Sequence, residues 1–549
     1  MSEAQAGRVP ASIARPWRRG GETMRDFNVP GRSAAMAANG MVATSAPRAT
    51  LTGLDVLRSG GNAVDAAIAA VAMQCVVEPM STGIGGDCFV LYSKGGALPI
   101  ALSGAGRAPA KAHVEWYAER QIREIAVQTP HAATVPGCID AWCLLNREHG
   151  TRPLSELLEP AAKAAEDGYV VTPRVAHDWA RNENKLRDPH TAKVMLVDGR
   201  APKAGDTMRN PALARTLRRI GREGRDAFYE GAVARDIVNR LKELGGLHEE
   251  ADFAAQRSSW VEPIHASYRG HDVYECPPAN QGLTALMILK TLEGYALGGD
   301  GFSEADRLHL LAEATKAAFY VRDNFIGDPD FVAVDVEKFL SAEWAERSRR
   351  EISFVRALPP RHWDGIEHKD TIYLCVVDRD GNSVSFINSL FSAFGTGIIG
   401  PESGVILHNR GSGFRTIPGH PSAIAPGKRP FHTLIPGMLV KDGRAVMPFG
   451  VMGGQYQAVG HATFLHRLLD RGMDPQQAAE APRIFAYQGA LQVEHFVPEP
   501  IRDDLARRGH KIEMLDMPVG GCQAIQIDWE RGVLIAGSEP RKDGLALGY

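Results

Sequence analysis

Apolar residues in the earlier part of the chain recur mainly every three to four positions, the repeat of helices that bury one face. This pattern predicts helices at residues 49–58, 62–77, 154–167, 211–223, 283–297 and 303–323. Asn62 follows a glycine pair and is a suitable N-cap for the second helix. A Gly-rich turn leading into a buried strand is predicted at 80–92, and a further strand at 268–275. This region therefore has a mixed α/β pattern.

The pattern changes after residues 347–369, a charged stretch without periodicity that contains two consecutive prolines and is predicted to be an exposed linker. Apolar strands at 371–377 and 383–394 flank an Asp-Gly turn, which strongly indicates a hairpin. Further strands are predicted at 434–441, 445–450, 524–528 and 533–537, with helices at 457–471, 475–481 and 501–508. Hairpin-linked strands with helices between them indicate sheets covered by helices, an α+β arrangement.

Composition narrows the functional classes. The 549 residues carry 62 Lys+Arg against 65 Asp+Glu, a net charge of -3, which argues against a general polyanion binder. A chain that is 44% hydrophobic and 23% charged is not largely disordered. The length allows two to four domains or one large layered enzyme fold.

The N-terminus and the cysteines indicate the cellular compartment in which the protein is expected. Residues 1–27 are expected to form a disordered tail, and translation could start at Met1 or Met24. No apolar window is long enough to span a bilayer, and the N-terminus lacks the apolar core of a secretory signal. The chain has 7 cysteines, an odd number with no CxxC pair. Buried, reduced thiols in a cytoplasmic protein are the expected reading.

Several common cofactor motifs are absent or incomplete. The sequence has no HExxH, Cys/His ligand cluster or GKS/T loop, so neither a metal nor a nucleotide cofactor is expected. One GxGxxG occurs at 395–400, but Pro401 and Glu402-Ser403-Gly404 follow where a helix must begin. Without a helix N-terminus to hold a pyrophosphate, this segment is interpreted as a turn.

Asp370-Thr371 is the first candidate for chemistry. A threonine that begins a buried strand directly after an exposed linker suits an autoprocessing N-terminal nucleophile. Attack of its hydroxyl on the Asp370 carbonyl would cut the chain and free an α-amino group. With a pKa near ~8, that amine would serve as the base for the nucleophile. Threonine also begins many ordinary strands, so spacing alone leaves both readings open.

Gly453-Gly454 is the second candidate. Consecutive glycines after a strand can present two backbone N–H groups to an oxyanion. An ordinary turn has the same sequence, and the residues alone do not separate the two.

These pieces together resemble the γ-glutamyltransferase (γ-glutamyltranspeptidase) family of N-terminal nucleophile hydrolases over residues 28–549. The resemblance rests on GLDVLRSGGNAVDAAIA (53–69), TGIGGDCFVL (82–91), NPALARTLRRIGREGRDAFYEG (210–231), GDPDFV (327–332), DTIYLCVVDRDGNSVS (370–385), FGTGIIGPESGVILHN (394–409), PGKRP (426–430) and GLALGY (544–549). The order and spacing of these motifs fit along hundreds of residues.

The resemblance implies a four-layer αββα sandwich made from a proenzyme. The implied cut lies between Asp370 and Thr371 and gives a large subunit, 28–370 after the tail, and a small catalytic subunit, 371–549, which together form one heterodimeric fold. Thr371 matches the nucleophile, Ser389 a second hydroxyl that steadies it, and Gly453 and Gly454 the oxyanion hole. The hairpin register expected from the sequence places Leu390 opposite Thr371, so that a one-residue bulge would be needed to bring Ser389 across.

The acyl pocket departs from the γ-glutamyl pattern. The arginine that binds the substrate α-carboxylate matches Ala105, with Arg107 two residues on. The groups that hold the α-amino group (Asn, Gln and Asp) match Phe391, Arg410 and Gly413, and a serine pair matches His432-Thr433. The groups that recognise a glutamyl zwitterion are therefore changed while the catalytic residues are kept.

This change predicts a preference. Loss of an acid at Gly413 and gain of Arg410 make that end of the pocket electropositive, which repels an ammonium and attracts a carboxylate. A carboxylate could be held by Arg410 or Arg107. We therefore hypothesise that the substrate's acyl group is anionic and lacks an ammonium, as in a dicarboxylic monoamide. The resemblance implies relatives with such a preference, the oxamate amidohydrolases and the cephalosporin acylases. In the alternative, Arg410 points to solvent or pairs with Glu402.

Two functions are compatible with this sequence. One is an autoprocessing amidohydrolase or γ-glutamyltransferase acting on a small amide without cofactor, nucleic acid or membrane. The other is a catalytically silent member of the same family that binds or assembles with other molecules. Retention of Thr371, Ser389 and the glycine pair favours the first.

Overall fold

The computed structural model describes residues 17–19, 22–24, 31–359 and 371–549. Most of the expected N-terminal tail, the end of the linker and Asp370 therefore lie outside the described residues. Trp17–Arg19 (β1) and Glu22–Met24 (β2) pair as a short antiparallel ribbon.

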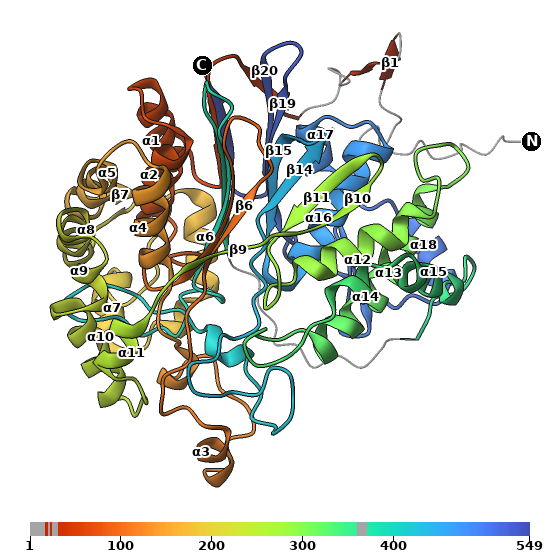
Figure 1. The fold of residues 1–549 in the computed structure, drawn as a ribbon. Helices are drawn as coiled ribbons and strands as arrows, with labels where there is room; N and C mark the ends of the chain where they lie inside the picture. Colours follow the sequence, from red (N-terminus) through yellow and green to blue (C-terminus); the bar gives the residue numbers. More distant parts are fainter. Residues whose placement is uncertain (1–16, 20–21, 25–30, 360–370) are drawn as a thin grey trace, which may run out of the picture.

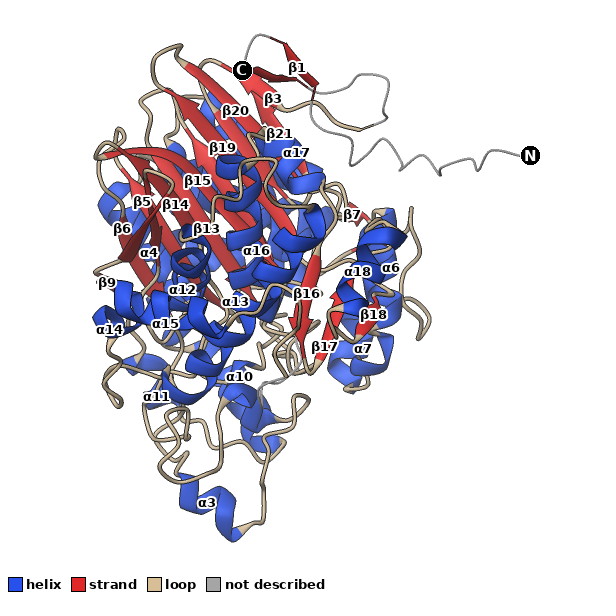
Figure 2. Cartoon of the chain, turned by 90° about the vertical axis from the view of Figure 1, so that its right-hand side faces the viewer, coloured by secondary structure: helices blue, strands red, loops and turns tan. Residues whose placement is uncertain are grey.

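Two seven-stranded sheets stacked face to face form the centre of the protein, with helices on both outer faces (Figure 1). Figure 2 shows the strands of these sheets running side by side across the molecule. This arrangement confirms the four-layer αββα sandwich expected from the sequence.

The first sheet carries the strands next to Thr371. Its order is β21 (Leu545–Gly548), β4 (Met41–Thr44), β12 (Ile372–Val377), β13 (Ser383–Ser389), β5 (Asp87–Ser93), β6 (Ile100–Gly104) and β9 (Ser259–Val261). Every named pair in it is antiparallel. Strand β4, from the N-terminal part of the chain, lies between β21 and β12 from the C-terminal part.

The second sheet mixes the two parts of the chain in the same way. Its order is β10 (Ile264–Tyr268), β11 (His271–Glu275), β14 (Gly437–Lys441), β15 (Arg444–Met452), β19 (Gly521–Asp528), β20 (Val533–Ser538) and β3 (Ala35–Ala37). Smaller sheets pair β7 (Tyr169–Val170) with β8 (Thr207–Met208), and β16 (Ile484–Tyr487) with β17 (Ala490–Val493) and β18 (Ile512–Met514).

Helices cover the outer face of each sheet. The first sheet is covered by α1 (Pro47–Arg58), α2 (Ala63–Val77) and α4 (Cys138–His149), and α5 (Leu154–Asp167) and α8 (Pro211–Glu223) pack outside α2. The second is covered by α12 (Gly282–Glu293), α13 (Glu304–Phe325), α15 (Ala342–Glu351), α16 (Gln457–Leu465) and α17 (Pro475–Glu480).

The remaining helices lie at the ends of the sandwich and between these layers. They are α3 (Val114–Glu119), α6 (Pro173–Arg181), α7 (Pro189–Met195), α9 (Asp226–Tyr229), α10 (Ala232–Glu243), α11 (Glu250–Ala255), α14 (Val336–Leu340) and α18 (Glu499–Arg507). No described helix is both long enough and apolar enough to pass through a membrane.

The inner faces of the two sheets meet in an apolar layer. Buried side chains of the first sheet, such as Phe89 and Tyr373, pack in one cluster with Met438 and Ile525 of the second. Burial of apolar surface contributes roughly 25 cal/mol per Å², so this layer and the two helix-covered faces supply most of the driving force for folding. The layer also fixes the position of the strand ends that carry the candidate site.

Local expectations were confirmed in part. Asn62 caps α2 in a capping box with Asp65. The strand expected at 268–275 is confirmed as β11, but it begins only at His271, because Arg269 and Gly270 adopt positive φ angles of 52° and 73° and turn the chain between β10 and β11. The linker expected from 347 was also placed too early, since α15 continues to Glu351.

Candidate active site

Thr371 and Ser389 lie opposite each other at the open end of a hairpin. Ile372 pairs with Asn388 in the β12–β13 ladder, which places Thr371 directly across from Ser389. The Thr371 Oγ1 and Ser389 Oγ atoms are 3.0 Å apart, and both residues are buried. The Ser389 Oγ also accepts a 2.8 Å hydrogen bond from the Phe391 N–H, which fixes its position.

The sequence-based register was wrong by one residue. Strand pairing already begins at Val377 and Ser383, so the turn contains five residues, 378–382. The Asp378 carboxylate holds this turn by accepting 3.0 Å bonds from the N–H groups of Asp380 and Asn382. Ser389 therefore faces Thr371 without the bulge that the sequence analysis required.

The next strand adds an acid to this row. Asp87, the first residue of β5, pairs with Ser389, and paired residues in a sheet point to the same face. The Asp87 Oδ1 accepts 3.0 Å bonds from the N–H groups of Gly106 and Gly137. A threonine, a serine and an aspartate thus follow one another across three adjacent strands.

Asp87 also contacts two histidines. Its Oδ2 lies 3.4 Å from His408 Nδ1 and 3.7 Å from His432 Nε2, and all three side chains are fully buried. Burial raises the pKa of the Asp87 carboxyl, while His408 and Arg410 oppose that rise. Burial lowers the pKa of both imidazoles, and Arg410 lowers that of His432 further. Both histidines are therefore neutral at pH 7.

Arg410 is buried beside the same cluster. Its Nη1 donates a 3.1 Å hydrogen bond to Thr433 Oγ1, and its guanidinium lies 4.1 Å above the Phe391 ring. Within the described part of the chain, its Nε and Nη2 have no hydrogen-bond partner, and it forms no ion pair within 4.0 Å. Burial lowers its pKa to about 9, against the opposing effect of Asp87.

The burial of Arg410 bears on the alternative in which it points to solvent. The side chain is fully buried, so the alternative in which it points to solvent is wrong. Phe391 links Arg410 to Ser389, because the residue whose ring lies under the guanidinium also donates its N–H to the Ser389 hydroxyl. Phe391 has a φ of 78°, an unusual angle for a residue other than glycine, which turns the chain sharply after β13.

Arg107 has a different environment. It lines a pocket of about 500 Å³ together with Ala105 and His432. Its Nη1 donates a 2.9 Å bond to Gly427 O, and its guanidinium lies 3.4 Å from Asp330 Oδ2. Its side chain is 36% exposed. Arg107 is thus already paired, whereas Arg410 has donors free of protein partners among the described residues.

The glycine pair follows β15 in a tightly held turn. Gly453 has a φ of 118°, and a Cβ added there would lie 2.7 Å from Gly520 Cα, so the position requires glycine. The Gly454 carbonyl accepts a 2.9 Å bond from Gln281 Nε2. Gly453 and Ser392 line the same pocket of about 530 Å³, which brings this turn to the segment that follows Ser389.

Gly413 marks open space near Arg410. It ends the 3₁₀ turn Arg410–Gly413, and a Cβ added to it would meet only the Phe431 carbonyl oxygen, 3.8 Å away. The position where the γ-glutamyl pattern has an acid could therefore accommodate a side chain.

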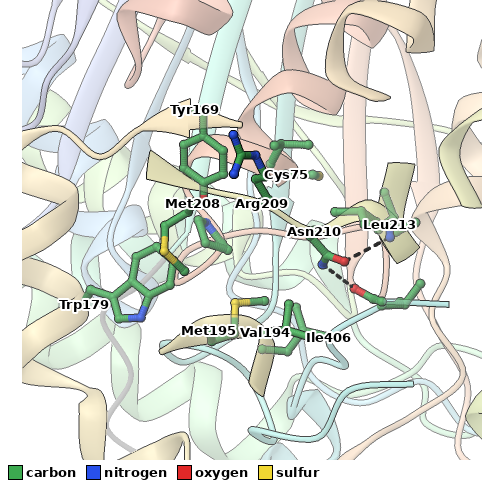
Figure 3. Close-up of a pocket in the computed structure, with 16 residues that line it drawn as sticks. Cys75, Tyr169, Trp179, Val194, Met195, Met208, Arg209, Asn210, Leu213 and Ile406 are labelled. Atoms are coloured by element: carbon green, nitrogen blue, oxygen red, sulfur yellow. Dashed lines mark hydrogen bonds between the residues drawn. The ribbon is translucent and has the colours of Figure 1, made fainter. Parts of the chain in front are cut away.

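A third cavity contains none of the expected site residues. Figure 3 shows this pocket of about 20 Å³, whose wall is mostly apolar and includes Tyr169, Trp179, Met195 and Met208. The Asn210 side chain at its edge caps α8 and bonds to the Gly404 carbonyl. This pocket has the character of a gap in the core.

Sequence reasoning missed Asp87 and His408. Asp87 lies in TGIGGDC at the start of a predicted buried strand. An acidic residue in that position was the signal that could have marked it as a site residue. Its partners His408 and His432 lie more than 300 residues further along the chain, and no local pattern joins them to Asp87.

Comparisons with known proteins identify the family. The sequence profile of the gamma-glutamyltranspeptidase family matches residues 49–549. The glutathione hydrolase-like YwrD proenzyme of Bacillus subtilis is 36% identical over 513 residues, covering 91% of this chain and 96% of that protein. The oxamate amidohydrolase proenzyme of Klebsiella pneumoniae is 34% identical, covering 94% of this chain and all of that protein.

A solved structure agrees over the whole fold. The cephalosporin acylase from Bacillus halodurans superposes with a TM-score of 0.90 at 39% identity, covering 96% of this chain and 99% of that chain. Sequence profile, relatives and fold coincide over nearly the full length, so this chain belongs to the γ-glutamyltranspeptidase family.

Proposed function

We propose that this protein is an autoprocessing threonine hydrolase that cleaves an amide bond through an acyl-enzyme on Thr371. The observation that carries the proposal is the 3.0 Å contact between the hydroxyls of Thr371 and Ser389. It brings two hydroxyl groups together at Thr371, the residue that the expected cut would make the N-terminus of the small subunit. Membership of a family whose relatives are named as hydrolase and amidohydrolase proenzymes supports the same chemistry.

Maturation requires one cut. The Thr371 hydroxyl attacks the Asp370 carbonyl carbon, the peptide C–N bond breaks, and water hydrolyses the resulting ester. This frees the α-amino group of Thr371 and gives subunits 1–370 and 371–549 that remain together as a heterodimer. An α-amino group has a pKa near ~8, so part of it is neutral at pH 7 and can accept the hydroxyl proton.

Turnover repeats this chemistry on a substrate. The Thr371 oxygen attacks the substrate amide carbon while the α-amino group takes the hydroxyl proton and passes it to the leaving amine. Gly453 and Gly454 supply N–H groups to the oxyanion. Water or an acceptor amine then attacks the acyl ester and regenerates Thr371.

Arg410 is the proposed anchor of the acyl group. A buried guanidinium with two donor nitrogens free of protein partners suits a carboxylate, which it can bind in a bidentate manner. Phe391 and Thr433 hold the guanidinium in place, and His432 lies near the bound group. Arg107 is the secondary candidate, because binding a substrate there would compete with Asp330 and Gly427.

The preferred acyl group is therefore an anion without an ammonium, as in a dicarboxylic monoamide. Gly413 provides no acid for an ammonium. Asp87 is the buried acid near Arg410, and its Oδ1 is occupied by two backbone N–H groups. The relatives named oxamate amidohydrolase and cephalosporin acylase support this class, and the relative named glutathione hydrolase-like supports a γ-glutamyl substrate as the competing one.

A substrate panel tests the proposal. Processed protein is assayed with γ-glutamyl, glutaryl and oxamyl amides that share one leaving amine. We expect higher kcat/KM for a glutaryl or oxamyl amide, and a preference for the γ-glutamyl amide would overturn the assignment of the acyl group. A denaturing gel tests the chemistry: wild-type protein should give two bands, and Thr371→Ala one. A single wild-type band would favour a catalytically silent protein.

We also propose a cytoplasmic location. All seven cysteines are unpaired, and six of them are buried, which fits a reducing compartment. Fractionation of the native host with compartment markers tests it, and recovery outside the cytoplasm would contradict it.

A further inference from the structure

A second cluster of ionisable side chains lies outside the candidate active site, on the helical layer over the second sheet. His309 and Glu313 are one turn apart on α13, and His510 follows α18. The His309 Nδ1 and His510 Nε2 atoms are 2.8 Å apart, and His510 Nε2 is 3.8 Å from Glu313 Oε1. All three ligand atoms lie within 4.8 Å of one another, and all three residues are buried.

The proton on His309 is fixed by its surroundings. Its Nε2 lies 2.7 Å from the Ser353 carbonyl oxygen, which can only accept a hydrogen bond. Nε2 therefore carries the proton, and the lone pair of Nδ1 points toward His510. Metal-binding histidines commonly donate their other ring N–H to a backbone carbonyl in this way, which orients the ring and fixes its tautomer.

We propose that His309, Glu313 and His510 bind one divalent transition-metal ion of the zinc class. Two imidazole nitrogens and one carboxylate oxygen form a donor set that zinc accepts, with a fourth position left for water. Metal–ligand distances of about 2.0–2.1 Å in a tetrahedron separate the ligands by about 3.3 Å. The two measured separations lie on either side of that value, so small side-chain shifts create the site.

The two imidazoles face each other at the site, with His309 Nδ1 and His510 Nε2 2.8 Å apart. Without metal, the His510 Nε2–H donates to His309 Nδ1, and binding requires only that this proton move to the His510 Nδ1.

Lys316 would compete with a metal ion for the Glu313 carboxylate. Its ammonium lies 2.7 Å from Glu313 Oε1 and also donates to the Leu358 carbonyl oxygen at 2.8 Å. The Leu358 N–H in turn donates to Glu313 Oε2. A metal must share the Glu313 carboxylate with this cation, so Lys316 lowers the affinity that the two histidines alone would give.

A pocket beside the cluster gives a metal ion access to the three ligands. His510 and Lys316 line a pocket of about 180 Å³ that offers an entry path and room for the water ligand. Two ligands precede Thr371 in the chain and the third follows it. After the proposed cut, the metal would therefore join the two subunits, although metal binding itself does not depend on the cut.

Metal titration of the full-length protein tests the proposal. Protein stripped with EDTA is titrated with Co²⁺ and Zn²⁺ at pH 7, and bound metal is counted by elemental analysis. We expect one metal per chain, visible d–d absorption of four-coordinate Co²⁺ that Zn²⁺ displaces, and an upward shift of Tm. The same result is expected for uncut Thr371→Ala protein, which separates this site from the proposed function.

Variants locate the metal. His309→Gln and His510→Gln should weaken Co²⁺ binding by roughly tenfold or more, while the exposed His265→Gln should match wild type. Lys316→Gln removes the competitor and should bind at least about threefold more tightly. No stoichiometric metal in the wild type, or equal binding in all variants, overturns the proposal. The wild-type and Lys316→Gln results decide the matter even if a histidine variant fails to fold.

Discussion

The Ser389 hydroxyl lies 3.0 Å from the Thr371 hydroxyl and also accepts the N–H of Phe391, whose ring lies under Arg410. The short turn from Ser389 to Phe391 at the end of β13 therefore connects the proposed nucleophile to the proposed substrate anchor. Changes at either end of this turn are expected to affect different kinetic constants.

Ser389→Ala should lower kcat with little change in KM. Loss of the hydroxyl leaves the Phe391 N–H without its acceptor and removes a partner from Thr371, and each such hydrogen bond contributes about 1 kcal/mol. We expect a fall in kcat of roughly tenfold and slower self-cleavage, measured by steady-state kinetics and by gel time courses.

Ser385→Ala is the matched control for this change. Ser385 is a buried serine on the same strand, and its hydroxyl contacts the Tyr373 hydroxyl at 2.7 Å, away from Thr371. Its kcat should stay within about twofold of wild type. An equal loss in both variants would mean that Ser389 acts through stability alone.

Arg410→Gln should weaken turnover of anionic acyl donors selectively. A charge-assisted hydrogen bond contributes about 1.5–3 kcal/mol, so kcat/KM for a glutaryl amide should fall roughly 10- to 100-fold. Turnover of a butyryl amide, which lacks the carboxylate, should change little. Arg107→Gln should have a smaller effect because Arg107 is already paired. The assignment is wrong if both amides lose activity equally.

Gly413→Asp should shift preference toward γ-glutamyl amides. A Cβ at this position meets only the Phe431 carbonyl oxygen at 3.8 Å, an ordinary van der Waals contact, so the backbone there accepts a side chain. Its carboxylate attracts an ammonium and partly neutralises Arg410. We expect the ratio of kcat/KM for γ-glutamyl over glutaryl amides to rise about tenfold.

Gly413→Asn provides the control for that substitution. It has nearly the same shape as the aspartate variant but no charge, and it should leave the ratio of the two substrates almost unchanged. A similar rise in both variants would point to shape and not to charge.

A buried ion pair predicts how stability depends on pH. Glu539 is fully buried and interacts with Arg483 and Arg541. Burial would raise its pKa, but the two arginines outweigh that effect and hold it at about 2, below its ordinary value of 4.5. A lowered acid pKa stabilises the fold above the ordinary value, and this stabilisation is lost as the pH falls from about 4.5 toward 2.

Glu539→Gln tests this pair. Breaking a buried pair leaves an uncompensated charge and costs about 3–5 kcal/mol, so Tm at pH 7 should fall markedly. The variant should also lose less Tm than wild type between pH 4.5 and 3. Glu530 is exposed, so the Tm of Glu530→Gln should match that of wild type at pH 7 and change equally between pH 4.5 and 3. A Glu539→Gln variant that behaved in this way would refute the prediction.

The sequence predicted the hairpin of β12 and β13 because its signal is local: two apolar runs and an Asp-Gly turn. The register within it was missed by one residue, since it depends on how the Asp378 carboxylate holds the turn. The segment 395–400 was correctly interpreted as a turn, and Gly395 and Gly397 there have positive φ angles of 55° and 69°.

The site residues that could be predicted from the sequence are those that a single position in a motif identifies. Thr371, Ser389 and the glycine pair have recognisable positions in the family pattern. Asp87 and its histidines come together only through strand order, which no local pattern encodes. The His309–His510 pair was missed for the same reason, because its members are 201 positions apart.

The interleaving of the sheets bears on the order of folding and the proposed cut. Strand β4 pairs on one side with β21 and on the other with β12, so a separately made C-terminal chain would lack the strand between them. Each half alone would expose unpaired strand edges, which favour aggregation. We therefore expect the chain to fold as one piece before the proposed cut frees Thr371, and co-expressed halves should reconstitute poorly. Once formed, the cut pair would not separate on dilution, because separation of the chains would require unfolding both sheets.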